Sequence, residues 1–133
     1  MIKRETIGIP GVTHGSAPIP MGAKVGSIVY SSAIMGKDSQ TNELPMDAEG
    51  QMSCLFRNIA TFMNEAGGSI NSIVRMSVYL KDNSFRVLLN KEWKNMFPDE
   101  KDRPARHVSI QKDLQKGMVV QVELVAVLSL GYL

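Results

Sequence analysis

The chain has 133 residues, and its 15 lysines and arginines against 13 aspartates and glutamates leave a formal charge of +2. This length suits one hydrophobic core, so we expect a single domain over residues 1–133. A 44% hydrophobic fraction with 21% charged residues excludes a disordered chain, and the small net charge does not point to a nucleic-acid partner. One cysteine excludes an intrachain disulfide, and no apolar run reaches the ~18 residues of a membrane span. We therefore expect a cytoplasmic protein without a membrane segment.

The first third of the chain alternates between strand-like and loop-like composition. Residues 3–9 form a candidate strand, whereas residues 13–26 contain two prolines and three glycines and predict an ordered loop. Residues 27–34 are apolar and partly β-branched, which predicts a strand. The polar stretch 37–45 then predicts a surface loop.

The clearest helix is predicted from Asp47, a suitable N-cap, to about Ala66. Gly67 and Gly68 supply a left-handed C-cap, and residues 69–72 predict a turn or a short helical start. The helix prediction depends on apolar side chains that recur at offsets of three and four: Met52, Leu55, Phe56, Ile59, Phe62, Met63 and Ala66.

The second half of the chain predicts a strand, a helix and two further strands. Residues 73–80 alternate and form a strand, and a second helix runs from a Ser84 cap to about Phe97 with Pro98 as its stop. Residues 105–111 and 117–128 resemble an antiparallel pair. The order predicts an α+β sandwich, with one sheet and two helices on one face.

The last predicted strand has two unlike faces. One face is wholly apolar and is expected to meet the helices, whereas the other carries Gln121 and Glu123 among valines. Contiguous apolar patches of this kind are rare on the surface of monomers. We therefore expect homo-oligomerisation through this face, with closed symmetry.

Arg106 is the main candidate for a binding residue because it shares a strand face with Val108 and Ile110. A guanidinium on an apolar face must be paired or bind an anion. If the last two strands form a hairpin, its register places Arg106 opposite Gln121 and near Glu123. Two interpretations remain: a structural ion pair with Glu123 or an interface carboxylate, which periodicity alone favours, or a planar fork that binds a substrate carboxylate.

The other reactive side chains give weaker signals. Two histidines and one cysteine provide no zinc or iron spacing, so we expect no metal. His107 alternates away from Arg106 and is expected to pack toward the helices or a loop, while His14 lies in the Gly/Pro-rich loop. Cys54 is expected to be an inert, buried or half-buried thiol.

Five segments of the chain form a recognisable combination: GSIVYSSAI (26–34), EAGGSINSIVRMSVYLKD (65–82), FP (97–98), RPARHV (103–108) and VVQVELVAV (119–127). The most specific feature is EAGGS, a strand and LKD, followed at the right distance by PAR. Over about residues 18–127, this combination resembles the reactive-intermediate deaminase family (RidA/YjgF).

The resemblance implies a chorismate-mutase-like (bacillary-type) α+β subunit with one mixed sheet and two helices on one face. It also implies a homotrimer with a central barrel and ligand pockets between subunits. Active members hydrolyse enamine and imine intermediates such as 2-aminoacrylate to a keto acid and ammonia, and no cofactor is implied. The partner would be a small carboxylate-bearing imine, enamine or keto acid.

By position, Arg106 matches the family arginine that binds the substrate carboxylate, Ser32 matches a pocket serine, and Asn90 matches a common family asparagine. Gln121 replaces the glutamate that positions water, so a catalytic role for it would be limited to orienting water. The chain departs from the family at other pocket positions too: Ile19 replaces a tyrosine, Val108 a cysteine and Ala33 a glycine, while Glu123 occupies a separate, frequently acidic position.

Three functions follow from these residues. The first is a hydrolase, an imine or enamine deaminase with an altered water-positioning residue. The second is a non-catalytic binder of small carboxylic acids in the same cleft. The third, RNA chemistry as in relatives labelled endoribonuclease L-PSP, is the least favoured because acidic residues interrupt its basic cluster: Lys91, Lys94, Lys101 and Arg103 are interspersed with Asp99, Glu100 and Asp102.

Overall fold

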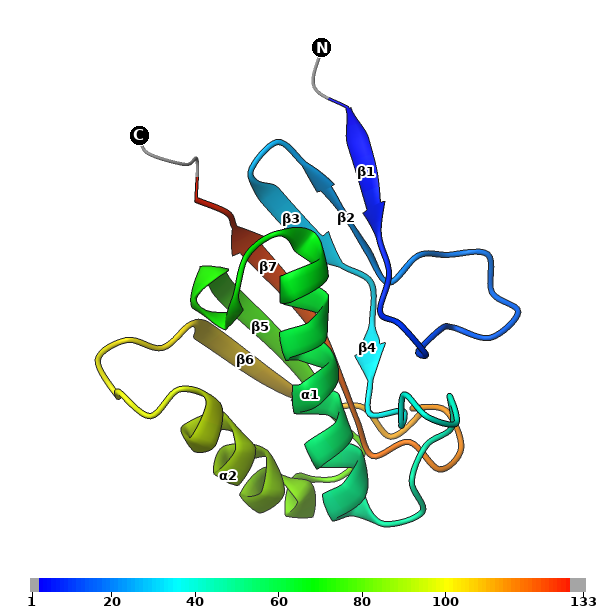
Figure 1. Cartoon of the computed structure of the whole chain (residues 1–133). Helices are drawn as coiled ribbons and strands as arrows, with labels where there is room; N and C mark the ends of the chain where they lie inside the picture. The colour runs from blue at the N-terminus through cyan, green and yellow to red at the C-terminus, as the bar shows by residue number, and fades with distance from the viewer. Residues whose placement is uncertain (1–2, 130–133) are drawn as a thin grey trace.

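The computed structural model describes residues 3–129, which form one mixed sheet of seven strands with two α-helices (Figure 1). The elements follow one another as β1 (Arg4–Ile7), β2 (Gly22–Val25), β3 (Ile28–Ser31), β4 (Ile34–Met35), α1 (Ala48–Ala66), η1 (Ile70–Ser72), β5 (Ile73–Leu80), η2 (Asn83–Phe85), α2 (Arg86–Met96), β6 (Ala105–Ile110) and β7 (Val120–Val127). The α+β class expected from the sequence is confirmed.

Helix α1 begins and ends where the predicted capping residues, Asp47 and Gly67, place its limits. The Asp47 side chain accepts a hydrogen bond from the Gly50 amide, which satisfies one of the free N–H groups of the first turn. Gly67 ends the helix in the left-handed conformation, at a φ of 94°. The helix buries its apolar stripe against the sheet, and this stripe supplies much of the core.

Helix α2 begins one residue later than the predicted Ser84 cap implies. Ser84 does not cap it, because a short 3-10 turn, η2, precedes α2 and the Asp82 side chain accepts the Ser84 amide at 2.9 Å. The helix then runs from Arg86 to Met96, with Pro98 just beyond its end as expected. Its buried side chains are Leu89 and Trp93.

The strands lie in the order β1-β2-β3-β7-β5-β6, with β4 also paired to β7. The predicted hairpin of the last two strands is wrong. Strand β6 pairs in parallel with β5, and β7 pairs antiparallel with β5 on its other side. The physical reason is the connection through α2, since a helical crossover brings the next strand back parallel to the first.

The region 13–26 is not wholly a loop, because it ends in strand β2. The prolines and glycines of this region predict a loop, but its last residues form a short strand. This strand makes a hairpin with β3 through Gly26, which has a φ of 60°. The predicted strand 27–34 is divided into β3 and β4, and both pair with β7.

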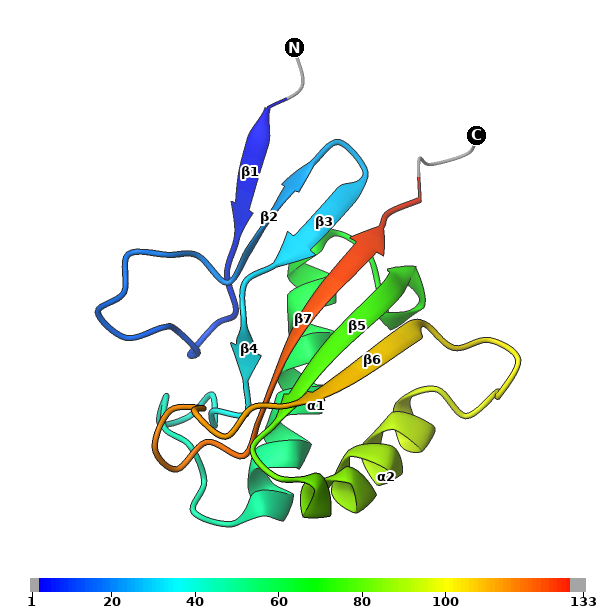
Figure 2. The same ribbon diagram turned by 180° about the vertical axis from the view of Figure 1, so that it is seen from behind.

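The two faces of the sheet differ as the last strand predicts. Both helices lie on one face (Figure 1), and the opposite face is uncovered when the molecule is seen from behind (Figure 2). Val120, Val122, Leu124 and Ala126 point to the helices and are buried. The uncovered face exposes large apolar side chains: Ile28, Tyr30 and Val127.

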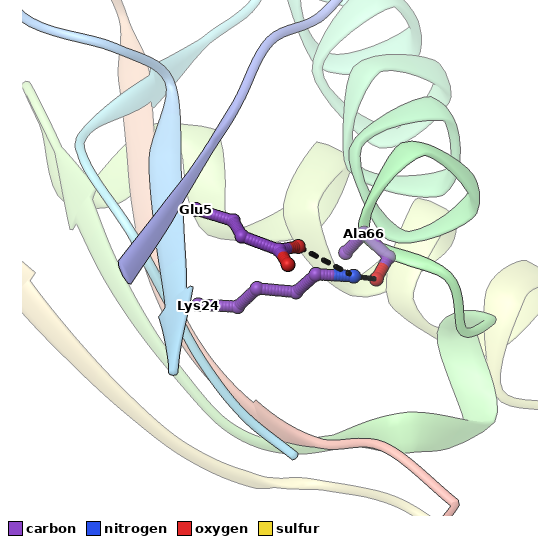
Figure 3. A network of polar contacts seen from close by, with 3 residues as sticks. All are labelled: Glu5, Lys24 and Ala66. Atoms are coloured by element: carbon purple, nitrogen blue, oxygen red, sulfur yellow. Dashed lines mark hydrogen bonds and ion pairs between the residues drawn. The ribbon is translucent and has the colours of Figure 1, made fainter. Parts of the chain in front are cut away.

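A lysine joins the sheet to the end of α1 (Figure 3). Lys24 on β2 donates a hydrogen bond from Nζ to the Ala66 carbonyl oxygen at 2.7 Å, and the same nitrogen lies 3.7 Å from a Glu5 carboxylate oxygen on β1. A cation at the C-terminus of a helix interacts favourably with the helix dipole. This contact joins β1 and β2 to the end of α1.

Residues 3–129 contain no helix that is long and apolar enough to cross a membrane. They also contain no group of three or more His, Cys, Asp or Glu side chains placed to hold a metal ion.

Candidate functional site around Arg106

Arg106 lies on the helix-facing side of β6. Its register partner is Met76 on β5, which is buried toward the helices, and Val108 is paired in the same way with the buried Val78. Since paired residues of neighbouring strands point to the same face, Arg106 and Val108 project toward α2. The prediction that Arg106 shares an apolar strand face with Val108 is confirmed, and this face of β6 is the one that the helices cover.

The predicted neighbourhood of Arg106, Gln121 and Glu123 is therefore wrong within one protomer. Strand β5 separates β6 from β7, a distance of about 10 Å between the outer two strands. Gln121 and Glu123 also point to the uncovered face, opposite the buried residues of β7. The hairpin assumption placed them together, and the parallel pairing of β6 removes that contact.

The Arg106 guanidinium packs against an aromatic ring, and one of its N–H donors has no hydrogen-bond acceptor. Its Cζ lies 4.9 Å from the centre of the Trp93 ring on α2, a cation–π geometry. The Nη1 atom is buried and has no hydrogen-bond partner. Burial, and secondly the nearby charge of Arg86, lowers the pKa of Arg106. An arginine donor left in this state is suited to an anion.

No carboxylate among the described residues of the protomer satisfies Arg106. Among residues 3–129, the ion pair closer than 4.0 Å is that of Lys24 with Glu5. The expected structural ion pair with Glu123 is thus absent from the described part of the chain. We call Arg106, Val108 and Trp93 the Arg106 group.

A second set of predicted site residues lies around the start of β7, and we call it the Ser32 group: Ile19, Ser32, Ala33, Gln121 and Glu123. The Ser32 hydroxyl donates to the Pro20 carbonyl oxygen at 2.8 Å, and the Ser32 amide donates to the Met21 carbonyl oxygen at the same distance. These bonds hold Ile19, whose surface is 51% exposed, beside the segment that joins β3 to β4.

Gln121 and Glu123 belong to the Ser32 group through β7. Gln121 is paired with Met35 of β4 and with Tyr79 of β5, and Glu123 lies two residues further along the same face. Hydrogen bonding to Glu123, with burial and its charge as smaller causes, raises the pKa of Tyr79. Glu123 therefore acts on the phenol of Tyr79, which lies on the neighbouring strand β5.

The two groups do not meet within one protomer. Strands β7 and β5 lie between β3 and β6, so about 14 Å separates the strand next to Ser32 from the strand of Arg106. The structure thus brings together five of the predicted residues in the Ser32 group, and it places Arg106 and Val108 elsewhere.

The remaining reactive side chains lie outside both groups. His107 pairs with Ser77 on the uncovered face and is exposed, so the prediction that it packs toward the helices or a loop is wrong. His14 is half-buried, and burial followed by the charge of Lys37 lowers its pKa. Cys54 is buried on α1, as expected.

Two residues near Arg106 were missed from the sequence: Trp93 and Arg86. Both lie in the second helix, for which the sequence pattern predicts no functional residue other than Asn90. The available signal was their spacing with Asn90, since residues 86, 90 and 93 lie on one face of a helix. That signal becomes useful only when the strand facing this stripe is known.

Comparison with known proteins places the chain in a family. The model described as Endoribonuclease L-PSP matches residues 17–128. A RutC family protein of Pyrococcus abyssi is 30% identical over 116 residues, which are 83% of this chain and 90% of that protein. TdcF of Escherichia coli, provisionally named a reactive intermediate deaminase, is 28% identical over 126 residues, which cover 94% and 95% of the two chains.

Solved structures give the same result. RidA from an Antarctic Psychrobacter is 31% identical with a TM-score of 0.85, and the match covers 93% of this chain and 99% of that one. Escherichia coli TdcF with bound serine is 25% identical with a TM-score of 0.84, covering 94% and 99%. The sequence, the mixed sheet with its two helices and these matches agree, and the chain belongs to the endoribonuclease L-PSP family, that of the RidA/YjgF reactive-intermediate deaminases.

Proposed function

We propose that the protein is an enamine/imine deaminase that hydrolyses reactive, carboxylate-bearing intermediates to a keto acid and ammonia. The observation that carries this proposal is the state of Arg106, whose buried Nη1 has no partner while its guanidinium rests on Trp93. A bidentate guanidinium contact is the usual way to orient a small carboxylate. The serine held by TdcF, a relative in the same family, is a ligand of this chemical class.

The site is completed by a neighbouring copy in a homotrimer. The Arg106 group of one protomer faces the Ser32 group of the next, which explains why residues matching one family pocket lie on distant strands. The apolar side chains of the uncovered sheet face provide the association surface: Ile28, Tyr30 and Val127 are each about half exposed. In this arrangement the uncovered faces line the centre of the trimer.

The reaction needs orientation more than strong acid–base catalysis. Water adds to the imine carbon, the C–N bond breaks, and the carbon keeps the water oxygen as a keto group while nitrogen leaves as ammonia. An iminium carbon is already electrophilic, so holding the carboxylate and the water in place provides much of the acceleration. The Gln121 amide orients the water but does not take its proton, and Ile19 and Val108 exclude bulk solvent.

A binder of small carboxylic acids without turnover is the second candidate. Two observations favour it. Gln121 cannot act as a general base, and the Ser32 hydroxyl already donates its proton to the Pro20 carbonyl oxygen. In that case Arg106 captures a keto acid in the same cleft.

The test generates 2-aminoacrylate with a serine dehydratase and follows its decay to pyruvate in the presence of the protein. The wild-type protein is expected to accelerate the decay, and Arg106→Ala should reduce the acceleration at least ~100-fold, about the loss of a charge-assisted pair of hydrogen bonds. Arg57→Ala is the matched control, because Arg57 is exposed on α1, away from β6, and donates a hydrogen bond to Ser53 of the same helix.

The two candidates give different results in the same assay. Unchanged decay with Arg106-dependent thermal stabilisation by keto acids would replace the deaminase with the binder. Equal acceleration by the wild-type protein and Arg106→Ala would contradict the proposed site altogether.

A further inference from the structure

Helix α2 presents a second arginine on the face that holds Trp93. Arg86, Asn90 and Trp93 follow one another at offsets of four and three, so they form one stripe of the helix. Buried Leu89 beside this stripe shows that it faces the sheet. Arg86 is half-buried, and its Nε donates to the Asn83 side-chain oxygen at 3.1 Å. This bond fixes the stem of the side chain and leaves its terminal nitrogens available.

The position of Arg86 is unfavourable for the stability of the isolated protomer. It is the first residue of α2, whose first turn has no acidic residue, and a cation there opposes the helix dipole. The charge of Arg86 also contributes, after burial, to the lowered pKa of Arg106. Like charges in partly buried positions repel each other, and a bound anion relieves this repulsion.

The nearby carboxylates do not provide that anion. Among residues 3–129, no carboxylate oxygen lies within 4.0 Å of either guanidinium. The Asp82 carboxylate accepts the Ser84 amide, and Glu92 lines a hollow with Ser53 and Met52 of α1, on the other side of the helix. Within residues 3–129, the positive charges of both arginines are therefore left without a carboxylate partner.

We infer that Arg86 is a specificity-determining residue that binds a second acidic group of the ligand anchored by Arg106. This inference rests on the proposed function, because it takes Arg106 as the carboxylate anchor. The preferred ligand is then a dicarboxylate, such as an imine derived from an acidic amino acid or the corresponding keto diacid. Arg106 binds the carboxylate next to the imine or keto carbon, and Arg86 binds the distal one.

The test compares two acids of equal chain length, 2-oxoglutarate and 2-oxopentanoate, which differ in the distal carboxylate. Titration calorimetry on the whole protein is expected to give at least ~10-fold tighter binding of 2-oxoglutarate to the wild type, as one charge-assisted contact provides. Arg86→Ala should remove this difference while 2-oxopentanoate binds as before. Arg86→Gln, which keeps the length of the side chain, provides the same test if the alanine variant is unstable.

Lys91→Ala is the matched control, since Lys91 is an exposed cation on α2 that contributes to the net charge but lies off the stripe. It should leave both affinities unchanged. Equal affinities of the wild type for the two acids, or a preference that persists in both Arg86 variants, would overturn the inference while leaving Arg106 as the anchor. If neither acid binds, or if binding is the same in Arg106→Ala, the proposed function fails as well.

Discussion

At the scale of single residues, two buried polar atoms lack a hydrogen-bond partner among the described residues, which lowers the stability of the isolated protomer. Arg106 is the main example, because the Trp93 ring stabilises its charge by ~0.5–2 kcal/mol but does not replace a hydrogen-bond acceptor for Nη1. The sequence identified Arg106 because a charge on an apolar strand face is conspicuous. It did not identify Trp93 or Arg86, whose relevance depends on which helix covers that face.

His14 is a second residue with an unused polar atom, since its Nε2 is buried without a hydrogen-bond partner. The adjacent Lys37 donates from Nζ to the Thr13 carbonyl oxygen at 2.7 Å, which places a positive charge beside the ring. Burial and this charge lower the pKa of His14 below its ordinary value of 6.5. Folding therefore favours the neutral imidazole.

We expect this preference to make stability depend on pH. The stabilisation is fully present above pH 6.5, where unfolded His14 is neutral too, and it is lost as the pH falls through the lower folded-state pKa. Urea unfolding at several pH values should show this loss in the wild type. The His14→Gln variant should not lose this stability between pH 6.5 and the folded-state pKa of His14. An identical dependence of the unfolding free energy on pH in the two proteins would show that His14 is not responsible for the loss.

At the scale of elements, the contacts that join the edge strands to α1 can be tested separately. Lys24 is part-buried and serves both the Ala66 carbonyl oxygen and Glu5, whereas the Glu5 side chain is 64% exposed. The helix contact should therefore contribute more than the ion pair, because exposed ion pairs are worth little.

We expect Lys24→Met to lower the free energy of unfolding by about 1–2 kcal/mol, since it removes a hydrogen bond and a favourable charge at the helix end. Glu5→Gln, measured in the same urea titrations, should change the free energy by less than ~0.5 kcal/mol. A cost for Glu5→Gln equal to that for Lys24→Met would show that the ion pair, and not the helix contact, fixes the edge strands.

The elements also show which parts of the fold the sequence can predict. Helix α1 and strand β5 are specified locally, by the Asp47 cap, Gly67 and the alternation over Ile73–Leu80, and both were predicted with their observed limits. Strand β2 was missed because its four residues, GAKV, carry no apolar alternation and depend on β1 and β3 for pairing. The partner of β6 was wrong because strand pairing is set by the α2 crossover, which local pattern does not reveal.

At the scale of the whole molecule, one protomer holds its predicted site residues in two separate groups. The Arg106 group is carried by β6, an edge strand of the sheet, and by α2, whereas the Ser32 group lies near β4 and β7. Figures 1 and 2 show that these elements lie apart. The uncovered sheet face offers the surface that would bring copies together. On this account the protein should sediment as a trimer at micromolar concentration, and a monomer would remove the basis of the cleft.

The most direct test of this account pairs two inactive variants in mixed oligomers. Arg106→Ala damages the Arg106 group, and Ile19→Asp places a repelling carboxylate in the Ser32 group at an exposed loop position that tolerates substitution. Each variant alone should lose the acceleration of 2-aminoacrylate decay. Co-expressed chains with different tags, purified as mixed trimers, should recover about a third of the wild-type activity, since one of the three interfaces of each mixed trimer joins two undamaged halves. No recovery in verified mixed trimers would contradict a site shared between neighbouring copies.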